Sequence, residues 1–341
     1  GVARLGRMTT PHPAHRALIV EKTDDGTHAR IVTGSEDLLG DGDVLIDVTH
    51  SSINYKDAMA LAGDPGVART FPLVPGIDAV GVVVESDSER FAPGDRVIVN
   101  GAGLGEFRHG GYATRLRVDA ASTIVLPDSM SSRHAAALGT AGFTASLAVA
   151  ALGKYGIHPG EDILVTGSTG GVGSIAIHLL SQAGYRVTAA TGRVEEFGDN
   201  LRRLGAWEVI DRAELSSPGK PLQKTRFDGV VDGLGSHTLV NAIAMTRRCG
   251  VITSYGLAQG PDLPGTVLPF ILRAVNLVGI NSVDADLSER IDRWRDLDEH
   301  VDRSVLDRLT STITLDEVID AGREQLTGNR SGRTVVELGD R

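Results

Sequence analysis

The chain has 341 residues, 41% of them hydrophobic and 23% charged, so it is long enough for two globular domains with a sizeable core. Its formal net charge of −10 argues against nucleic acid or an anionic membrane surface as the main partner. The single cysteine, Cys249, excludes an intrachain disulfide and a zinc site built from several cysteines.

The N-terminal segment 1–15 contains Arg4 and Arg7 but no apolar run typical of a signal peptide. We find no window with the run of about 18 apolar residues expected of a membrane-spanning helix. From these features we expect a cytoplasmic protein that is not inserted in a membrane.

The first third of the chain predicts a compact, mostly antiparallel β-domain. Short segments rich in β-branched residues alternate with turn signals of the Gly-Asp and Pro-Gly-Asp type. The strands that we expect are Arg16–Glu21, Asp43–Thr49, Gly81–Glu85 and Arg96–Val99.

From about Ser132 the pattern changes to alternating helices and apolar strands, which predicts a parallel, doubly wound sheet with helices on both faces. A long helix over Arg133–Tyr155, interrupted at Gly139 and Gly142, comes first. The six expected strands are Asp162–Thr166, Arg186–Thr191, Glu208–Ile210, Gly229–Asp232, Gly250–Ser254 and Asn276–Ile280. The helices expected among them are Val172–Ala183 and one around Asn200–Leu204.

After Asp284 the chain is polar and helical over Leu287–Val301 and Leu315–Gln325, and it ends in a strand over Arg333–Leu338. The expected fold is α/β with two domains. Residues 14–133 and 284–341 would form a discontinuous, mostly β domain, and residues 134–283 an inserted dinucleotide-binding domain.

The strongest local motif is Thr166–Gly173 (TGSTGGVG), which follows an expected strand and opens an expected helix. In that context the helix N-terminal amides and the positive end of the helix dipole hold a pyrophosphate, and the glycines permit close approach. The alternative is a glycine-rich turn without a ligand. The candidate cofactor contacts in this motif are Ser168, Thr169, Gly170, Gly171 and Val172.

The end of the second expected strand indicates which cofactor binds. NAD-binding units place a carboxylate about 20 residues after the glycines, to bind the ribose 2′-hydroxyl. Here that place holds Thr191, Gly192 and Arg193, which offer a hydroxyl and a guanidinium to a 2′-phosphate. We therefore expect NADPH, with a solvent-facing Arg193 as the alternative.

Two further segments end expected strands at the same edge of the sheet, where ligands bind in open α/β folds. They are Asp232–Gly235 and Tyr255–Ala258, whose glycines are equally compatible with ordinary turns.

Two segments of the first domain, Ser51–Asp57 (SSINYKD) and Phe71–Gly81 (FPLVPGIDAVG), together with the glycine motif, resemble the quinone oxidoreductase branch of the medium-chain dehydrogenase/reductase superfamily. The resemblance covers nearly the whole chain from about Arg16 onward. It implies a GroES-like, mostly β catalytic domain and a Rossmann NADPH-binding domain.

A narrower resemblance is visible in Asn54–Asp57, Gly139–Ala145 (GTAGFTA), Thr191–Arg193 and Pro269–Arg273 (PFILR). These segments look like the acrylyl-CoA reductase subfamily, whose members reduce acrylyl-CoA to propionyl-CoA with NADPH. Many members carry the broader label of putative quinone oxidoreductase.

The sequence departs from the zinc alcohol dehydrogenase branch, in which a Cys follows the corresponding strand and a His follows the Pro-Gly. We assign those places to Asn54 and Asp78. None of the ten histidines shows H-E-x-x-H or comparable spacing, and His109 is expected to be a loop residue. We therefore expect no catalytic metal.

Without zinc, hydrogen bonds must polarise the carbonyl while hydride adds to the β-carbon. Tyr55 is the candidate donor near the nicotinamide and the substrate, and its proton would reach the α-carbon directly or through water. Asn54 would orient substrate or water, Lys56 would support charge or contact a phosphate, and Asp57 would order the loop. The alternatives are a structural phenol for Tyr55 and simple loop hydrogen bonding for Asn54 and Lys56.

The resemblance places Thr144 beside the nicotinamide, and it implies that Leu257, Ile271 and Ser282 line the same cleft. Core packing is the alternative for Leu257 and Ile271. Arg69 and Arg273 are cations that could meet CoA phosphates, but solvation is the simpler expectation for both. Family members commonly form dimers by joining their dinucleotide-binding sheets edge to edge, which implies a homodimer through Thr266–Ser282.

The sequence therefore leaves three candidate functions. The first is NADPH-dependent reduction of acrylyl-CoA, and the second is reduction of a quinone or another enone by the same chemistry. The third is an NADPH-binding sensor without catalysis, because a fold alone does not establish activity.

Overall fold

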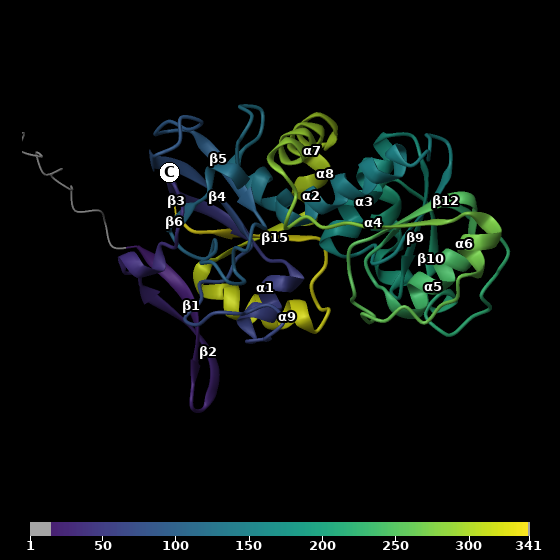
Figure 1. Cartoon of the computed structure of the whole chain (residues 1–341), viewed down its shortest axis with the longest axis horizontal. Helices are drawn as coiled ribbons and strands as arrows, with labels where there is room; N and C mark the ends of the chain where they lie inside the picture. The colour runs from purple at the N-terminus through teal and green to yellow at the C-terminus, as the bar shows by residue number, and fades with distance from the viewer. Residues whose placement is uncertain (1–14, 340–341) are drawn as a thin grey trace, which may run out of the picture.

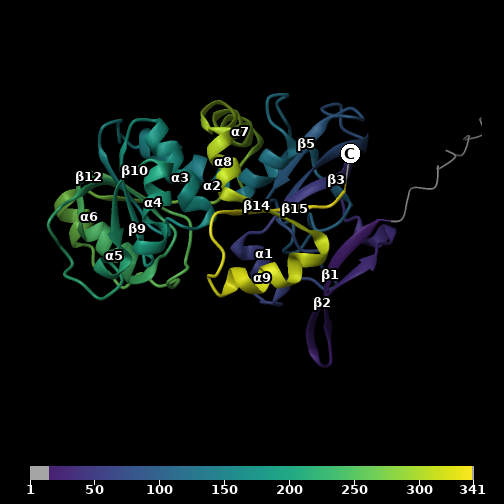
Figure 2. The same ribbon diagram turned by 180° about the vertical axis from the view of Figure 1, so that it is seen from behind.

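Two large β-sheets lie side by side along the long axis of the molecule in a computed structural model that describes residues 15–339 (Figures 1 and 2). Arg4 and Arg7, the expected domain start at residue 14 and the chain end at 340–341 lie outside the described residues. The expectation for the N-terminal segment therefore stays a prediction.

The first sheet is mostly antiparallel, as expected, and has the order β14-β15-β3-β4-β5-β7, with β6 also paired to β3. Only β14 and β15 run parallel among these pairs of described strands. Since β15 pairs with β3, the C-terminal strand completes a sheet that starts in the first quarter of the chain. The strands are β3 Val44–Ser52, β4 Asp78–Ser86, β5 Arg96–Asn100, β6 Arg115–Val118, β7 Thr123–Val125, β14 Thr310–Thr314 and β15 Arg333–Glu337.

Shorter elements flank this sheet. A hairpin of β1 and β2 packs its buried strand, β1, on the rest of the domain, while β2 stays largely exposed. The flanking elements are β1 Arg16–Thr23, β2 Gly26–Thr33, α1 Tyr55–Leu61 and α9 Val318–Leu326, with 3-10 turns at Glu36–Leu38, Ala120–Ser122 and Leu315–Glu317.

The second sheet confirms the doubly wound parallel fold. Its order is β10-β9-β8-β11-β12-β13, and every pair is parallel. The order reverses between β8 and β11, which is where such sheets open a crevice for ligands at the carboxyl ends of their strands. The strands are β8 Asp162–Val165, β9 Arg186–Thr191, β10 Ala206–Asp211, β11 Phe227–Asp232, β12 Thr246–Ser254 and β13 Asn276–Gly279.

Helices cover this sheet. We expected α3 and a short form of α4, and both are present, whereas α5 and α6 had not been predicted. Their bounds are α3 Gly171–Gln182, α4 Val194–Leu204, α5 Ser236–Ala244 and α6 Leu268–Arg273, with a 3-10 turn at Arg212–Glu214.

The long helix α2, Ser132–Lys154, joins the two sheets and is broken at one glycine rather than two. Gly139 has φ +48° and ψ −149°, so the helix stops there and restarts at Thr140. Gly142 lies within regular helix, so its predicted interruption was wrong.

The expectation that no segment is long and apolar enough to span a membrane was also wrong. Within residues 15–339, α2 is the one helix long and apolar enough to span a membrane, and most of that window is buried inside the protein.

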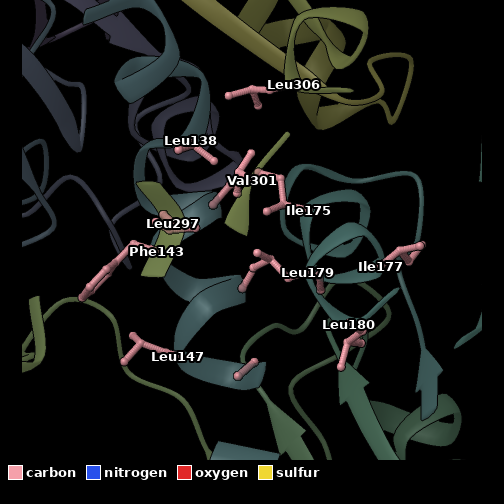
Figure 3. Packing of buried hydrophobic residues seen from close by; sticks show 14 of the residues in the cluster. Leu138, Phe143, Leu147, Ile175, Ile177, Leu179, Leu180, Leu297, Val301 and Leu306 are labelled. Atoms are coloured by element: carbon pink, nitrogen blue, oxygen red, sulfur yellow. The ribbon is translucent and has the colours of Figure 1, made fainter. Parts of the chain in front are cut away.

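The largest apolar core holds the two sheets together around α2. Leu138, Phe143 and Leu147 of α2 and Ile175 and Leu179 of α3 are buried members of this cluster (Figure 3). Residues of two C-terminal helices, α7 Leu287–His300 and α8 Arg303–Leu309, complete the cluster. Since each buried Leu contributes about 1.5–3 kcal/mol, this core fixes the C-terminal segment on α2.

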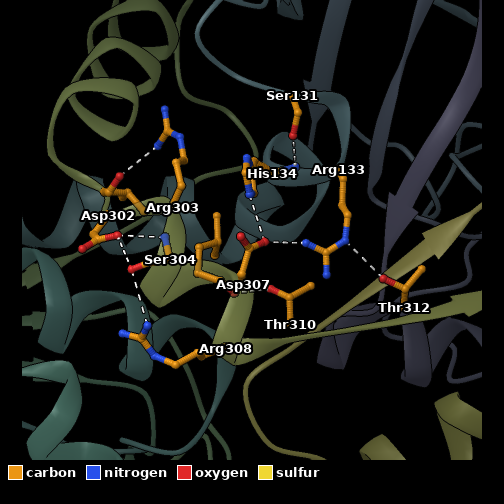
Figure 4. A network of polar contacts seen from close by, with 12 residues as sticks. Ser131, Arg133, His134, Asp302, Arg303, Ser304, Asp307, Arg308, Thr310 and Thr312 are labelled. Carbon is orange, nitrogen blue, oxygen red and sulfur yellow. Dashed lines mark hydrogen bonds and ion pairs between the residues drawn. The ribbon is translucent and has the colours of Figure 1, made fainter.

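Polar contacts at the start of α2 reinforce this arrangement (Figure 4). Arg133 Nη1 and His134 Nε2 both reach Oδ1 of Asp307 in α8, at 2.6 and 3.0 Å. These groups are partly exposed, so each pair contributes at most about 1 kcal/mol.

Candidate active site

The glycine loop between β8 and α3 has the geometry of an anion site. Gly170 is the N-cap of α3, and among the described residues no side chain caps this helix start. Its first amides and the positive end of its dipole therefore remain available to a phosphate. Gly173 is required by packing, because a Cβ there would lie 2.3 Å from the carbonyl oxygen of Gly167. Ser168 is buried and donates to the Val165 carbonyl at 2.8 Å, so its hydroxyl braces the loop.

Arg333, the first residue of β15, reaches this loop from the C-terminal segment. Its guanidinium is buried, and a Cβ on Gly171 would lie 2.8 Å from its Nη1. Nε donates to the Ala137 carbonyl at 2.6 Å and Nη1 to Asn54 Oδ1 at 3.1 Å, whereas Nη2 has no partner among the described residues. A buried cation with an unused donor beside an uncapped helix start fits a pyrophosphate.

Two guanidiniums flank the end of β9. Arg193 lies over the ring of Phe197, 4.3 Å from its centroid, and pairs loosely with the exposed Glu196 at 3.7 Å. Arg212 comes from the end of the neighbouring strand, and a Cβ on Gly192 would lie 3.1 Å from its Nη2. Together with Thr191, this arrangement fits a 2′-phosphate.

The other strand ends at this edge pack tightly on one another. Thr166 donates to the buried Asp232 at 2.7 Å, and burial raises the pKa of Asp232. The hydroxyl of the half-buried Tyr255 lies close to Gly233, where a Cβ would approach it to 2.4 Å. The glycines of these two segments are therefore needed for close packing around the cofactor loop.

Tyr55 begins α1 with its side chain 45% exposed, and within residues 15–339 its hydroxyl makes no hydrogen bond. That phenol is free to meet a ligand. Lys56 is not, because its ammonium forms an ion pair with the buried carboxylate of Glu106. The structure therefore favours the structural alternative for Lys56.

Asn54 uses both ends of its side-chain amide within the protein. Nδ2 donates to Oδ2 of Asp78 at 2.7 Å and of Asp57 at 3.0 Å, and Oδ1 accepts from Arg333. Asn54 also caps α1, and its backbone amide donates to Asp57 at 2.9 Å. The structure again favours loop ordering over direct contact with a substrate.

Asp57 orders this loop, in line with the expectation for it. Its carboxylate accepts from the backbone amides of Asn54 and Ile77 at 2.9 and 2.8 Å. Burial, together with the nearby charge of Asp78, raises the pKa of Asp57 to about 7.

The assignment of Asp78 to the place of the zinc-ligating His needs correction, because Ile77 is the residue that directly follows Pro75-Gly76. Asp78 is fully buried, and its carboxylate already accepts hydrogen bonds from Asn54 and Thr140. Within residues 15–339, no cluster of three or more His, Cys, Asp or Glu side chains is placed to hold a metal ion.

The remaining candidates fall into two groups. Thr144 is buried in α2, and its hydroxyl donates to the carbonyl of Thr140 at 2.7 Å. Thr140 lies one helical turn earlier and is the residue that donates to Asp78. Leu257 and Ile271 are 55% and 68% exposed, so core packing does not explain them. Ser282 follows β13, and its carbonyl oxygen lies near Gly101, the residue after β5.

The structure accounts for two further side chains by structural contacts. The Arg273 guanidinium donates to the carbonyls of Ala244 and Gln223 at 2.7 and 2.8 Å, which anchors α6. His109 accepts a hydrogen bond from the Val74 amide at 3.1 Å and is a loop residue, as expected. Arg333 and Arg212 were missed in the sequence because their roles depend on strand neighbours far away in the chain.

Two family sequence models match the chain. The one described as alcohol dehydrogenase GroES-like domain matches residues 40–128. The one described as zinc-binding dehydrogenase matches residues 171–299.

Named relatives match almost the whole chain. An acrylyl-CoA reductase of Ruegeria pomeroyi is 39% identical over 326 residues, which covers 94% of this chain and 98% of the relative. A putative quinone oxidoreductase of Bacillus subtilis is also 39% identical, covering 95% and 98%.

Solved structures agree with these matches. The yhdH oxidoreductase from Salmonella enterica, in complex with NADP, has a TM-score of 0.92 at 40% identity, covering 95% of this chain and all of that one. The Bacillus subtilis protein yhfP with NAD bound has a TM-score of 0.91 at 38% identity, covering 96% and 100%.

Proposed function

Since this chain belongs to the medium-chain dehydrogenase/reductase superfamily, in the acrylyl-CoA reductase subfamily of its quinone oxidoreductase branch, we propose that it reduces acrylyl-CoA to propionyl-CoA with NADPH. The observation that carries the proposal is the free phenol of Tyr55, which begins α1 next to a buried network that reaches the dinucleotide loop through Arg333.

The cofactor assignment follows from the residues that would hold it. The uncapped start of α3 and Arg333 would bind the pyrophosphate, and Thr191, Arg193 and Arg212 the 2′-phosphate. When bound at these residues, NADPH would supply a hydride for the β-carbon of the conjugated thioester.

This chain's own groups would manage the charge and the proton. The Tyr55 hydroxyl donates a hydrogen bond to the thioester oxygen, which becomes enolate-like as hydride arrives. The α-carbon then takes a proton from water or from the phenol. Asn54 and Asp57 hold the start of α1 in place and so fix the backbone from which the Tyr55 side chain extends.

We propose that this chemistry needs no zinc. Asn54 and Ile77 stand where the zinc branch has Cys and His, and the carboxylate of Asp78 is taken up by protein donors. Hydrogen bonds to the substrate oxygen would replace the Lewis acid.

We also propose a homodimer in the cytoplasm. The segment Thr266–Ser282 exposes Val267, Ile271 and Leu272, with 61–68% of each side chain accessible, next to the edge strand β13. Exposed apolar side chains clustered in this way are typical of a protein interface. The single Cys249 is compatible with a reducing compartment.

A parallel assay separates the candidate substrates. Oxidation of NADPH would be followed with acrylyl-CoA, crotonyl-CoA and a benzoquinone under the same conditions. We expect the fastest turnover with acrylyl-CoA. Fast turnover with the quinone alone would favour the second candidate function, which the similarity to the putative quinone oxidoreductase supports. Tight NADPH binding without turnover of any conjugated carbonyl would favour a sensor.

A further inference from the structure

Asp78, the first residue of β4, has all its acceptor positions filled by protein donors. Oδ1 accepts from the backbone amide of Thr140 at 2.8 Å and from its hydroxyl at 2.7 Å. Oδ2 accepts from Asn54 Nδ2 at 2.7 Å and from the hydroxyl of Ser52. Four donors occupy the lone-pair positions of one carboxylate. Asp78 is therefore placed to hold other groups and not to bind a substrate or move a proton.

The Thr140 contact lies where α2 restarts after its break. The first amides of a helix lack backbone partners and carry the positive end of its dipole, so a carboxylate there is stabilising. Here that carboxylate comes from β4, a strand of the mostly antiparallel sheet. The break must be glycine, because a Cβ on Gly139 would lie 2.4 Å from Asp78 Oδ2.

This helix turn contacts the dinucleotide loop directly. The Cβ of Ala141, next to Thr140, lies 3.3 Å from where a Cβ on Gly171 would be. On the other side, Asn54 is bonded to Tyr55 in the chain and caps the helix that Tyr55 begins. One buried carboxylate thus touches both the segment that presents the phenol and the turn that supports the cofactor loop.

We propose that Asp78 is a positioning residue for hydride transfer, whose carboxylate fixes the Tyr55 segment against the helix turn that packs on the dinucleotide loop. The inference rests on the proposed function. Asp78 acts through Asn54 and Thr140 and touches no reacting atom. Its effect is on the distance between the substrate held at Tyr55 and the nicotinamide, and an error of about 1 Å in such a distance lowers rates by up to about 100-fold.

Two substitutions test this role, one at a donor to Asp78 and one at Asp78 itself. Thr140→Val removes one hydrogen bond to Asp78 and keeps both the backbone amide and the side-chain shape. Asp78→Asn removes the charge and one acceptor. Thr123→Val is the matched control, because the buried Thr123 hydroxyl donates to the Asp119 carbonyl at 2.8 Å, away from the site.

Each variant would be compared with the native protein in NADPH affinity, in the emission of bound NADPH, and in the isotope effect on kcat with C4-deuterated NADPH. For Thr140→Val we expect a Kd for NADPH within about 2-fold of native and a smaller rise in NADPH fluorescence on binding. We also expect a kcat about 10-fold lower, with a larger isotope effect. Asp78→Asn should change the same quantities further, and Thr123→Val should match the native protein.

Native emission and a native isotope effect in Thr140→Val would overturn the proposal, whether or not Asp78→Asn folds. A loss of NADPH affinity with an unchanged isotope effect would also overturn it, since that pattern belongs to a binding or purely structural role. The emission readout needs no substrate, so it stays informative if the native protein reduces a quinone in place of acrylyl-CoA.

Discussion

Neighbouring residues of the candidate site have opposite surroundings, and this contrast decides their roles. The Tyr55 side chain is 45% exposed, and within residues 15–339 its hydroxyl makes no hydrogen bond. On either side of it, Asn54 and Lys56 are bound to buried carboxylates. A reaction that develops negative charge on a carbonyl oxygen needs a donor that is not already used, and in this segment that donor is Tyr55.

Replacing Tyr55 by Phe removes this donor and little else. We expect kcat/KM for the enoyl thioester to fall about 100- to 1,000-fold, as for other single donors to an oxyanion, with NADPH affinity unchanged. Steady-state kinetics would check this, with Tyr155→Phe as the control, since Tyr155 is similarly exposed at the end of α2. Native kinetics in the Tyr55→Phe variant would remove the phenol from the mechanism.

The cations at the end of β9 should govern the choice of cofactor. Replacing Arg212 by Ala removes the guanidinium that lies over Gly192. The KM for NADPH should therefore rise about 10- to 100-fold, while the KM for NADH stays unchanged. Arg193→Ala should act in the same direction. Arg202→Ala, on the exposed side of α4, is the control. Equal losses with both cofactors would show that Arg212 serves folding and not the 2′-phosphate.

The raised pKa of Asp57 makes stability depend on pH. An acid with a pKa of 3.8 unfolded and about 7 folded binds more protons in the folded state between these values, so stability falls as pH rises through this window and is level above it. The slope from one such group is at most about 1.4 kcal/mol per pH unit.

Urea unfolding of the native protein and of Asp57→Asn, measured across roughly pH 4 to 8, would isolate this slope. The Asn variant should show a flatter dependence, whatever constant offset it has from its lost acceptor. The exposed turn substitution Asp25→Asn should retain the native slope. Parallel curves for Asp57→Asn and the native protein would place the titration elsewhere.

At the scale of elements, the parts predicted from sequence are those whose residues point to one face or lie in a buried run. The strands of the parallel sheet were found in this way. The exposed β2 and the short β6, β7 and β14 gave no such pattern. Two of the missed helices, α1 and α6, did carry signals: Asn54 and Asp57 form a capping box at the start of α1, and Pro269 stands in the first turn of α6.

Site geometry was less predictable than the fold for a physical reason. The Lys56–Glu106 pair and the approach of Arg333 to Asn54 join residues far apart in sequence, through the order of strands in a sheet. Local spacing gives the identity of such groups but not their partners.

The break in α2 gives a stability prediction at this scale. Gly139→Ala should destabilise by more than about 2 kcal/mol, because φ is +48° and the new Cβ would meet Asp78 Oδ2. Gly153→Ala, in regular helix of the same element with no atom within 4 Å of its new Cβ, should stabilise by about 0.5–1 kcal/mol. Equal effects at the two positions, measured by denaturant unfolding, would contradict this account of the break.

For the whole molecule, the two sheets are joined by α2 and by the C-terminal segment that packs on it (Figure 1). The Arg333 side chain extends from β15 to the glycine loop between β8 and α3. The last strand therefore belongs to the antiparallel sheet and also contacts the dinucleotide-binding part of the chain. The apolar segment around Ile271 and Leu272 lies at the far end of the parallel sheet, beside its edge strand β13.

A charge in that apolar segment should disrupt the proposed dimer. Ile271→Glu introduces a carboxylate into an interface that would be apolar, so light scattering should report a dimer for the native protein and a smaller mass for the variant. Trp207→Glu, on the opposite edge strand β10, is the control at a position that is also mostly exposed. A monomeric native protein would rule out the dimer.

The central claim, hydride transfer to the β-carbon of acrylyl-CoA, has one direct test. The protein would be incubated with acrylyl-CoA and NADPH deuterated at C4 on the transferred face, and the product analysed by mass spectrometry and NMR. The account predicts propionyl-CoA with one deuterium on the β-carbon. Unreacted acrylyl-CoA, under conditions in which a quinone is reduced, would contradict it.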